Sequence, residues 1–520
     1  MSVTPLHLVA GILHTDQYQL AMAQVYFRQG LHQRPARFDW FFRSYPDYGE
    51  HQAGYAITAG LEWLLEWMEV TTFSPDDIEV LRVQRTSGGD PRFDDDFLSW
   101  LSGKGFDELT VHAVPEGRVV HAHVPIVTVE GPLAMAQILE TALLNRLNYQ
   151  TLIATKASRV KEAARQGTVL DFGTRRGPDL GAAAGSRAAL IGGADHSSNV
   201  EVSHLLGFDP KGTHAHSLVQ VFMALGAGEL EAFRAFAARY PDECVLLVDT
   251  VDTLESGIPN AITVFRELEA EGHRPAGVRL DSGDLAYLAI RSAELLDDAG
   301  FPEVSIVLSS DLDELAIWQI LSQIDVEAPR YGVDPRALAA RLTYGVGTRL
   351  ITSAGHSALN GVYKLVAVAD DAGDWVPAIK VSENVVKVPT PGEKEVWRVY
   401  DERGLATADV IGLGGEDLAG TDDLPILHPH RAGVRRTIPR ERISAIESLL
   451  EPVFANGSRT GDVASIGEMR ARRDADLNRL DTGVRRIVNP HIYHVSLTER
   501  MKGLQCLLVD NARDSVLGND

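Results

Sequence analysis

The middle of the chain alternates short apolar, β-branched runs with longer segments of helical periodicity. This alternation is typical of βα units built around a parallel sheet or barrel. The expected strands, each given with the helix that follows it, are 168–172 with 180–191, 245–248 with 259–272, 277–280 with 285–299, 304–308 with 312–324, and a further strand at 342–346. The pattern therefore predicts a parallel α/β core in the middle of the sequence.

The segments on either side of this core have a different pattern. Residues 110–131 and 362–400 consist of short β-branched runs interrupted by Pro and Gly, which favours antiparallel sheet. A long stretch of helical character at 132–164 links the first of them to the core, and residues 404–425, rich in Gly and Asp, favour a loop or a solvated edge. We therefore expect a second, strand-rich domain built from both flanks.

These patterns divide the chain into four consecutive parts. The expected boundaries are 1–131 for the N-terminal part of the sheet-rich domain, 132–354 for an α/β barrel, 355–450 for a return segment that completes the sheet-rich domain, and 451–520 for a C-terminal helical region and tail.

Composition narrows the class of protein further. The 520 residues are 45% hydrophobic and carry 49 Lys and Arg against 72 Asp and Glu, a net charge of −23 that disfavours broad binding to nucleic acids or membrane surfaces. Cys244 and Cys506 are the only cysteines in the sequence, too few for a disulfide framework. The apolar stretch 6–13 lacks the basic residues that precede the apolar core of a secretory signal, and no run approaches the roughly 20 apolar residues of a membrane span. We expect a cytoplasmic protein.

Polar and glycine-rich residues follow each expected strand of the core. In parallel architectures all strands end on one side, so these segments are expected to share one pocket. The segments are Gly173-Thr174-Arg175-Arg176, Asp249-Thr250, Asp281-Ser282-Gly283-Asp284, Ser309-Ser310-Asp311 and Gly345-Val346-Gly347-Thr348. Glycine amides and arginines suit phosphate, and the aspartates suit Mg²⁺ or its waters, so the pocket favours a phosphorylated substrate. A helix cap is the structural alternative for Asp281.

Two histidines stand close together in Gly212-Thr213-His214-Ala215-His216-Ser217. Extended residues at i and i+2 point the same way, so His214 and His216 are a possible metal pair. One of them could instead act as a base or nucleophile, or both could be structural. The sequence leaves these alternatives open.

Seven motifs in order resemble those of the nicotinate phosphoribosyltransferase family, and the likeness runs from about residue 13 to about residue 500. They are Thr15-Asp16-Gln17-Tyr18-Gln19-Leu20-Ala21-Met22-Ala23, Asp171-Phe172-Gly173-Thr174-Arg175-Arg176, Ser198-Asn199-Val200, the Gly212 to Ser217 segment, the Val278 to Asp284 segment, Gly345-Val346-Gly347-Thr348 and Gly361-Val362-Tyr363-Lys364-Leu365.

The resemblance implies an irregular type II phosphoribosyltransferase α/β barrel beside a sheet-rich α+β sandwich domain. It also implies that nicotinate and phosphoribosyl pyrophosphate give nicotinate mononucleotide and pyrophosphate, the entry step of NAD salvage. ATP is the implied co-substrate and Mg²⁺ the implied cofactor, with no metal held by the protein alone. The family further implies a homodimer in which Tyr18 reaches the neighbouring site.

Roles carry over residue by residue. His216 resembles the histidine that ATP phosphorylates transiently, and Asp281 joins it in the catalytic set. The implied nicotinate contacts are Tyr18, Thr213 and Arg279, and the implied contacts to phosphoribosyl pyrophosphate are Arg175, Ser309, Ser310, Gly345, Gly347 and Thr348. The alternative function is a metal-dependent barrel hydrolase that uses the His-x-His pair, and a nicotinamide-specific transferase is the nearest enzymatic rival.

Overall fold

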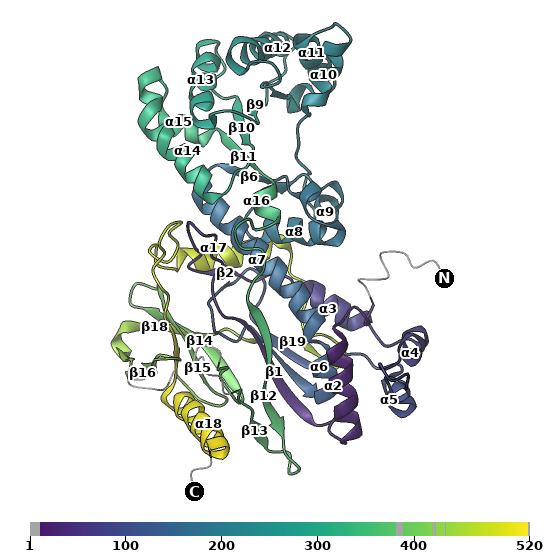
Figure 1. The fold of residues 1–520 in the computed structure, drawn as a ribbon. Helices are drawn as coiled ribbons and strands as arrows, with labels where there is room; N and C mark the ends of the chain where they lie inside the picture. The colour runs from purple at the N-terminus through teal and green to yellow at the C-terminus, as the bar shows by residue number, and fades with distance from the viewer. Residues whose placement is uncertain (1–10, 381–387, 419, 421–422, 432, 518–520) are drawn as a thin grey trace. The chain divides into compact units, whose positions relative to one another are not determined.

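The structure is a computed structural model that describes residues 11–380, 388–418, 420, 423–431 and 433–517 (Figure 1). The chain forms two compact units: unit 1 is Met1–Leu152 with Ala358–Asp520, and unit 2 is Ile153–Ser357. Residues 381–387 of the expected strand region, 419, 421 and 422 of the expected loop, and the two chain ends lie outside the described residues. Unit 1 therefore combines both ends of the chain, and unit 2 is continuous.

Unit 2 contains the parallel sheet expected from the sequence. Within its described residues the sheet has six strands in the order β7-β6-β11-β10-β9-β8, and every neighbouring pair is parallel. The strands are β6 (Thr168–Asp171), β7 (His196–Ser197), β8 (Val245–Leu247), β9 (Gly277–Leu280), β10 (Ser305–Ser309) and β11 (Leu342–Val346). The five expected strands are confirmed within one residue at each end, and the two-residue β7 was not expected.

Helices connect the strands of unit 2, as parallel pairing requires. They are α8 (Asp179–Ile191), α9 (Val200–Leu205), α10 (His216–Ala224), α11 (Glu229–Arg239), α12 (Ile258–Ala270), α13 (Leu285–Asp298), α14 (Glu314–Glu327), α15 (Pro335–Ala340) and α16 (Thr348–Ile351). Asp284 caps α13 by accepting the N–H of Tyr287 at 3.1 Å. Capping therefore falls to Asp284, and Asp281 is free of that structural role.

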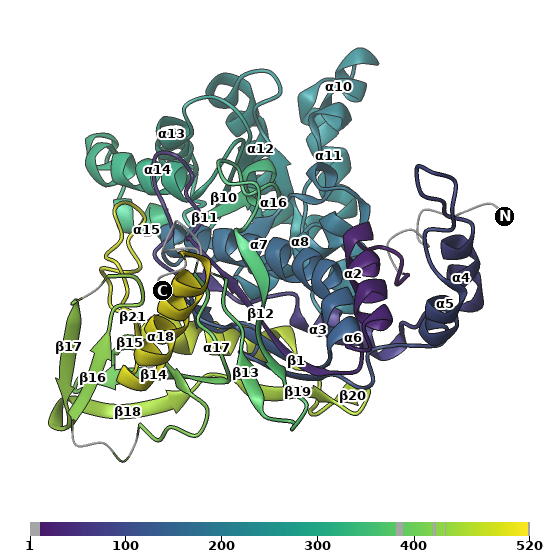
Figure 2. The same ribbon diagram turned by 60° about the horizontal axis from the view of Figure 1, so that its bottom comes forward.

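Unit 1 is built on two larger sheets (Figures 1 and 2). As far as the structure describes it, the first is antiparallel, in the order β13 (Trp375–Pro377), β12 (Gly361–Ala369), β1 (Pro35–Phe42), β5 (Val127–Pro132), β3 (Thr110–Ala113), β19 (Glu451–Ala455) and β20 (Ser458–Arg459). The second runs in the order β17 (Arg435–Pro439), β16 (Asp423–Leu427), β21 (Val495–Leu497), β15 (Ala406–Leu413), β14 (Lys394–Asp401) and β18 (Ile443–Ser448). The strand-rich character expected for both flanks is confirmed in these residues.

The helices of unit 1 include the long one expected at 132–164. It is two helices, α6 (Leu133–Ile138) and α7 (Glu140–Ala164), and α7 continues past the boundary into unit 2. The others are α2 (Gln17–Arg28), α3 (Leu61–Val70), α4 (Pro75–Arg82), α5 (Asp95–Leu101), α17 (Ile466–Asn478) and α18 (Glu499–Leu517), and a two-stranded sheet joins β2 (Ala56–Ile57) to β4 (Val119–Val120).

The prediction of a loop or solvated edge at 404–425 is wrong for much of that segment. Strand β15 lies inside the second sheet, between β21 and β14, and most of its residues are buried. Its Gly412 is a packing residue, because a Cβ there would lie 2.8 Å from the ring of Trp397. Its Asp409 is fully buried because Arg398 pairs with it through two hydrogen bonds of 2.8 and 2.9 Å. Gly412 and Asp409 therefore belong to a buried strand, although the Gly-rich and Asp-rich composition of the segment favoured a loop.

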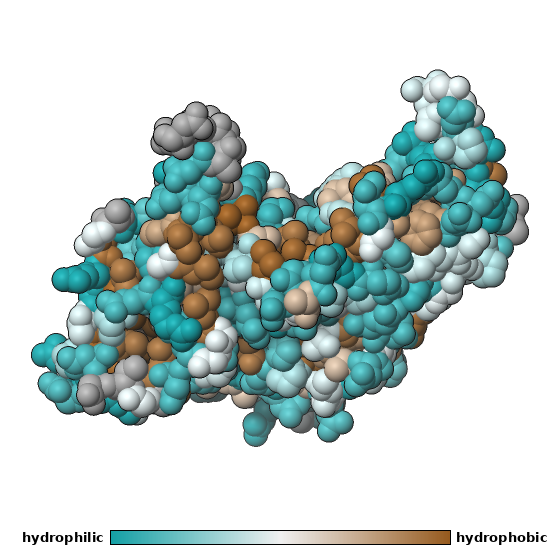
Figure 3. Space-filling view, turned by 90° about the horizontal axis from the view of Figure 1, so that it is seen from below, coloured by the Kyte–Doolittle hydropathy of each residue, from teal (hydrophilic) through white to brown (hydrophobic). Residues whose placement is uncertain are grey.

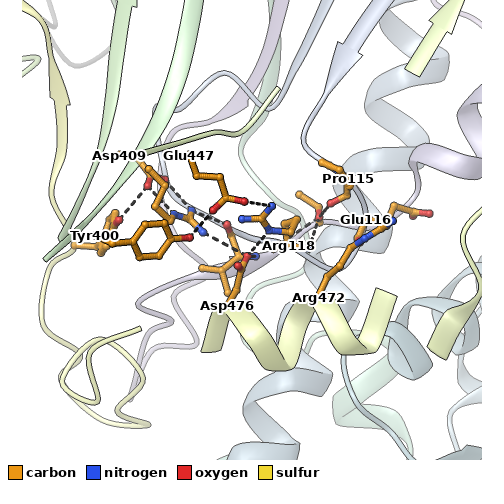
Figure 4. Close-up of polar contacts among 12 residues, drawn as sticks. Pro115, Glu116, Arg118, Tyr400, Asp409, Glu447, Arg472 and Asp476 are labelled. Carbon is orange, nitrogen blue, oxygen red and sulfur yellow. Dashed lines mark hydrogen bonds and ion pairs between the residues drawn. The ribbon is translucent and has the colours of Figure 1, made fainter. Parts of the chain in front are cut away.

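Arg398 and Asp409 belong to a buried charge cluster in unit 1, which also contains Arg118, Glu447 and Asp476 (Figure 4). Arg118 contacts Asp476 at 2.8 Å and Glu447 at 3.0 Å, and Arg398 contacts Asp476 at 3.3 Å. The side chains come from β14, β15, β18, α17 and the segment before β4. The cluster thus joins chain segments more than 270 residues apart, since Arg398 also donates to the carbonyl of Val119 at 2.8 Å.

Apolar side chains fill the interior of each unit and also reach the surface. In the space-filling view, hydrophilic residues cover most of the visible face, and apolar residues gather in groups between them (Figure 3). A sizeable apolar share of the surface is ordinary for folded proteins. No helix in the described ranges has the length and hydropathy needed to cross a bilayer.

Candidate active site

The loops that leave the carboxyl ends of the unit 2 strands lie side by side. Strand register pairs Leu247 with Arg279, Leu308 with Leu280, and Ser309 with Gly345. Because all the pairings are parallel, the residues that follow these strands leave on the same side of the sheet. The register thus places these strand-end segments on one side of the sheet, and the expectation that they share one pocket stays a prediction.

Arg279 contacts residues from several loops on that side. Its Nε donates to Ser309 Oγ at 2.9 Å, its Nη1 donates to Thr213 Oγ1 at 3.1 Å, and its Nη2 donates to Asp281 Oδ1 at 2.9 Å. The guanidinium also lies over the ring of Phe172, 5.6 Å from the ring centre. Four loops distant in sequence are therefore held together by one side chain.

The Arg279 charge is already paired with Asp281 in the structure, at 2.9 Å. Burial alone would raise the pKa of Asp281, but hydrogen bonds from Ser309 and the charge of Arg279 lower it below its ordinary value. Asp281 is thus an anion beside the guanidinium. A guanidinium has five N–H donors, and the three contacts above leave two of them for a bound carboxylate.

His216 lies next to this group and is held by a second aspartate. His216, the first residue of α10, contacts Asp249 Oδ1 through Nε2 at 3.1 Å. The other oxygen of Asp249 accepts the N–H of Asp281 at 3.0 Å and the hydroxyl of Ser282 at 2.6 Å. A carboxylate only accepts hydrogen bonds, so Nε2 carries the proton in neutral His216 and Nδ1 carries the lone pair.

His214 turns away from His216 and serves the fold. Its Nε2 accepts the backbone N–H of Leu247 at 3.1 Å, and its Nδ1 lies 3.3 Å from the carbonyl of Ala215. Burial, with the Arg279 charge, lowers the pKa of His214, which keeps the ring neutral. Both ring nitrogens are engaged by backbone, so the interpretation of His214 and His216 as a metal pair is wrong. It assumed extended backbone, whereas His216 begins a helix.

Phe172 explains one of the expected phosphate-loop glycines. A Cβ at Gly345 would overlap the Phe172 ring, and one at Gly347 would lie 3.1 Å from the Phe172 carbonyl oxygen. Gly345 is buried within β11, and Gly347 and the exposed Thr348 form the turn that follows. Gly345 therefore lets the ring lie beneath Arg279, and the turn at Gly347 and Thr348 is the part that faces outward.

The remaining expected residues of unit 2 lie on neighbouring turns. Ser310 is exposed directly after β10, and Arg175 is exposed in the 3₁₀ turn Thr174–Arg176 after β6. Asp171 holds the start of the latter turn, because its buried carboxylate accepts the N–H of Gly173 at 2.8 Å. Within the described part of unit 2, neither Ser310 nor Arg175 forms a hydrogen bond or ion pair with Arg279 or His216, so both lie on turns beside these residues without contacting them.

Tyr18 lies in unit 1, on α2, and its side chain is 49% exposed. Partial burial and the nearby carboxylates of Glu140 and Asp16 raise the pKa of the Tyr18 phenol to about 12. The phenol is therefore neutral at physiological pH. It is the one expected site residue that unit 2 does not contain.

Sequence reasoning missed the roles of Asp249 and Phe172. Asp249 was noted at a strand end, but only the folded chain shows that it orients His216. Phe172 lies in an expected motif, and the adjacent glycines were the available signal, since a buried glycine often marks a close neighbour. Among the described residues, no group of three or more His, Cys, Asp or Glu side chains is arranged to hold a metal ion.

Comparisons with known proteins agree with one another. The family models described as nicotinate phosphoribosyltransferase (NAPRTase) N-terminal domain and nicotinate phosphoribosyltransferase C-terminal domain match residues 13–148 and 393–505. A Bacillus subtilis (strain 168) protein named nicotinate phosphoribosyltransferase is 39% identical over 490 residues, which cover 94% of this chain and 93% of that protein. The strand-end residues of unit 2 lie between the two matched ranges, and the full-length relative spans them.

Solved structures give the same picture. The crystal structure of human nicotinic acid phosphoribosyltransferase matches with a TM-score of 0.77 and 29% identity, covering 95% of this chain and 99% of that one. A nicotinate-nucleotide pyrophosphorylase from Pyrococcus furiosus matches with a TM-score of 0.62 and 20% identity, covering 92% and 98%. The second likeness establishes only a shared mixed α/β fold with a sheet-rich part.

Proposed function

The chain belongs to the nicotinate phosphoribosyltransferase family, and from this premise we propose how its residues make nicotinate mononucleotide from nicotinate and phosphoribosyl pyrophosphate. The observation that carries the proposal is the convergence of Thr213, Asp281 and Ser309 on Arg279, beside the His216–Asp249 pair. The protein is an enzyme of NAD biosynthesis.

Arg279 is the proposed recognition residue for nicotinate. Its two remaining N–H donors suit the substrate carboxylate, and a charge-assisted hydrogen bond of this kind is roughly twice as strong as a neutral one. Asp281 and Ser309 hold the guanidinium in place, so little order is lost when the ligand binds. Nicotinamide has no carboxylate, and its neutral amide would gain less from this site.

The reaction itself needs positioning more than proton transfer. The pyridine nitrogen attacks the anomeric carbon of the ribose while pyrophosphate leaves, through a transition state with positive charge on the sugar. We assign the phosphate groups to the rim formed by Gly347, Thr348, Ser310 and Arg175, which lie on partly or fully exposed turns. Their amides, hydroxyls and guanidinium are suited to donate hydrogen bonds to phosphate oxygens. We assign to Asp281, an anion beside Arg279, the stabilisation of the positive charge that develops on the sugar.

The carboxylates available here suit Mg²⁺ only when substrate phosphates supply further ligands. Mg²⁺ usually takes one or two carboxylates together with substrate phosphates. Both oxygens of Asp249 already accept hydrogen bonds, whereas only Oδ1 of Asp281 is engaged by Arg279 and Ser309. Asp281 would therefore hold the ion through Oδ2, and the ion would supply charge neutralisation for the departing pyrophosphate.

ATP coupling is assigned to His216. With its Nε2–H donated to Asp249, Nδ1 carries the lone pair that attacks the γ-phosphorus of ATP, and ADP leaves. The phosphorylated ring adds charge and hydrogen-bond acceptors beside Asp281, which changes the relative stability of substrate-bound states. Water later removes the phosphoryl group as inorganic phosphate and restores neutral His216.

Two finer features are also part of the proposal. We assign the six parallel strands of unit 2 and their helices to an irregular type II phosphoribosyltransferase barrel. We assign the active form to a homodimer, in which the exposed neutral Tyr18 contributes to the pyridine site of the neighbouring copy.

The proposed function is tested by chromatography of the reaction product. Purified protein incubated with nicotinate, phosphoribosyl pyrophosphate and Mg²⁺ should form nicotinate mononucleotide, and addition of ATP should increase the amount formed. Nicotinamide and quinolinate, run in parallel, should give little or no nucleotide. Absence of nicotinate mononucleotide under all conditions, or equal use of nicotinamide, would contradict the proposal.

The role of Arg279 is tested by its replacement. Arg279→Ala should lower kcat/KM for nicotinate by the equivalent of about 1.5–3 kcal/mol, as expected for lost hydrogen bonds to a charged group. Arg279→Lys keeps the charge but loses the forked geometry, so it should recover only part of the loss. Steady-state kinetics with nicotinate as the varied substrate measure both, and an unchanged kcat/KM in Arg279→Ala would exclude Arg279 from the nicotinate site.

A further inference from the structure

Two turns that we assign to phosphate binding lie next to each other in unit 2. Strands β10 and β11 are parallel neighbours with Ser309 paired to Gly345, so the turns that follow them emerge together. The first turn begins at Ser310, and the second is Gly347 and Thr348. Substrate phosphates can be held by both turns only if the spacing between them is fixed.

One ion pair crosses from the end of one turn to the end of the other. Arg349, the residue after Thr348, contacts Asp313 Oδ2 through Nη1 at 2.9 Å. The Asp313 side chain is 7% exposed and the Arg349 side chain 45%. The other oxygen of Asp313 caps α14 by accepting the N–H groups of Leu315 and Ala316 at 3.1 and 2.9 Å. Asp313 therefore uses both oxygens, one for its own helix and one for the neighbouring turn.

The Asp313 end of the pair is firmly anchored. Glu314, the next residue, is fully buried and forms ion pairs with Lys156 at 2.6 Å and Arg159 at 3.1 Å, both also fully buried. Between this anchor and β10, Ser310 and Asp311 have positive φ values of 94° and 42°. Non-glycine residues adopt such conformations only when surrounding contacts impose them. The first turn is thus a constrained segment with a fixed end at Asp313.

We propose that Asp313 and Arg349 are positioning residues for phosphoribosyl pyrophosphate, because their ion pair fixes the Gly347–Thr348 turn against the Ser310 turn. The inference rests on the proposed function and extends it to two residues that do not touch the substrate. Arg349 directly follows the second turn, and its ion pair with Asp313 holds that turn in place. Loss of either partner should let the second turn move and should lower the affinity for the phosphates of phosphoribosyl pyrophosphate. The proposed nicotinate contacts at Arg279 should stay unchanged.

The test is a double-mutant cycle on the pair. Asp313→Asn keeps a good helix cap and removes the charge, and Arg349→Met keeps an unbranched side chain, shorter than that of Arg, and removes its charge. Each change should raise the KM for phosphoribosyl pyrophosphate about tenfold and leave the KM for nicotinate unchanged. The double variant should be no worse than either single one, because the two residues act as a unit, and Arg349→Lys should restore much of the binding.

Arg341→Met is the matched control. Arg341 pairs with Asp297 at 2.6 Å at the opposite end of β11, so its loss tests whether any broken ion pair on this strand has the same effect. It should leave the KM for phosphoribosyl pyrophosphate unchanged.

Each alternative outcome is distinct. Equal changes in both KM values, or a raised KM for phosphoribosyl pyrophosphate in Arg341→Met, would indicate a general structural role and overturn the proposal. An unchanged or lowered KM in Asp313→Asn together with a raised one in Arg349→Met would show that Arg349 binds phosphate directly, which also overturns it. Wild-type protein that forms no nicotinate mononucleotide would contradict the proposed function, whereas active wild-type protein with unaffected variants would contradict only the positioning pair.

Discussion

Replacement of His216 by alanine is expected to abolish transfer of the γ-phosphate of labelled ATP to the protein. Asp249 fixes the ring through Nε2 and leaves Nδ1 as the nucleophile, and alanine supplies no atom that could take its place. The wild-type protein should carry a label that is lost in acid and stable in base, as expected for a phosphorus–nitrogen bond. Gel autoradiography after each treatment measures it.

Two companion variants make this result specific. Asp249→Asn keeps the imidazole but removes the carboxylate that orients it, so labelling should persist at a rate lower by about two orders of magnitude or more. His214→Gln retains a side-chain acceptor for the Leu247 N–H, and labelling should proceed as in the wild type. Full labelling of His216→Ala, or loss of label in His214→Gln alone, would show that another residue accepts the phosphoryl group.

Periodicity predicted the core of unit 2 well because its strands are short, apolar and regularly separated by helices. Strands β9 and β11 have the predicted bounds, β6 and β8 differ by one residue at their carboxyl ends, and β10 is displaced by one residue at both ends. The order of strands in the sheet, β7-β6-β11-β10-β9-β8, does not follow from the pattern. Periodicity identifies which elements form, whereas neighbour choice depends on tertiary packing that a single sequence does not display.

The candidate site was predicted as a set of strand ends, and its internal contacts were not. That Arg279 joins Thr213, Asp281 and Ser309 depends on register across neighbouring strands. The metal interpretation of His214 failed for a local reason, since a helix start at His216 changes the direction of the side chains. Composition wrongly predicted a loop at β15, because the sequence shows that an aspartate is polar but not that it is buried against an arginine partner.

The largest effect on stability is expected from Arg398→Met in the buried charge cluster. The change leaves Asp409 fully buried without the two hydrogen bonds from Arg398, although the hydroxyl of Tyr493 still donates to Asp409 Oδ1 at 3.0 Å. Removal of one partner of a buried pair typically costs about 3–5 kcal/mol. The loss should appear as a lower denaturant midpoint. Hydrogen exchange should accelerate most in peptides that cover β14 and β15, because unit 2 has no part in the cluster.

Arg403→Met is the matched control for this prediction. Arg403 lies in the same hairpin and forms hydrogen bonds of 2.8 and 3.0 Å with Asp401, but its side chain is 62% exposed. Exposed pairs usually contribute at most about 1 kcal/mol. Equal losses of stability in Arg398→Met and Arg403→Met would show that burial of the Arg398–Asp409 pair does not increase its contribution to stability.

Asp409→Asn tests the same cluster through its pH dependence. Burial alone would raise the pKa of Asp409, but the charge and hydrogen bonds of Arg398 lower it below its ordinary value. A carboxyl group with a lowered pKa stabilises the folded state above its unfolded pKa, and this contribution is lost as the pH falls through the folded value. The free energy of unfolding of the wild type should therefore exceed that of Asp409→Asn by a constant amount near neutrality, and the difference should shrink below about pH 4. A difference that persisted undiminished in acid would show that Asp409 contributes through its shape and not through its charge.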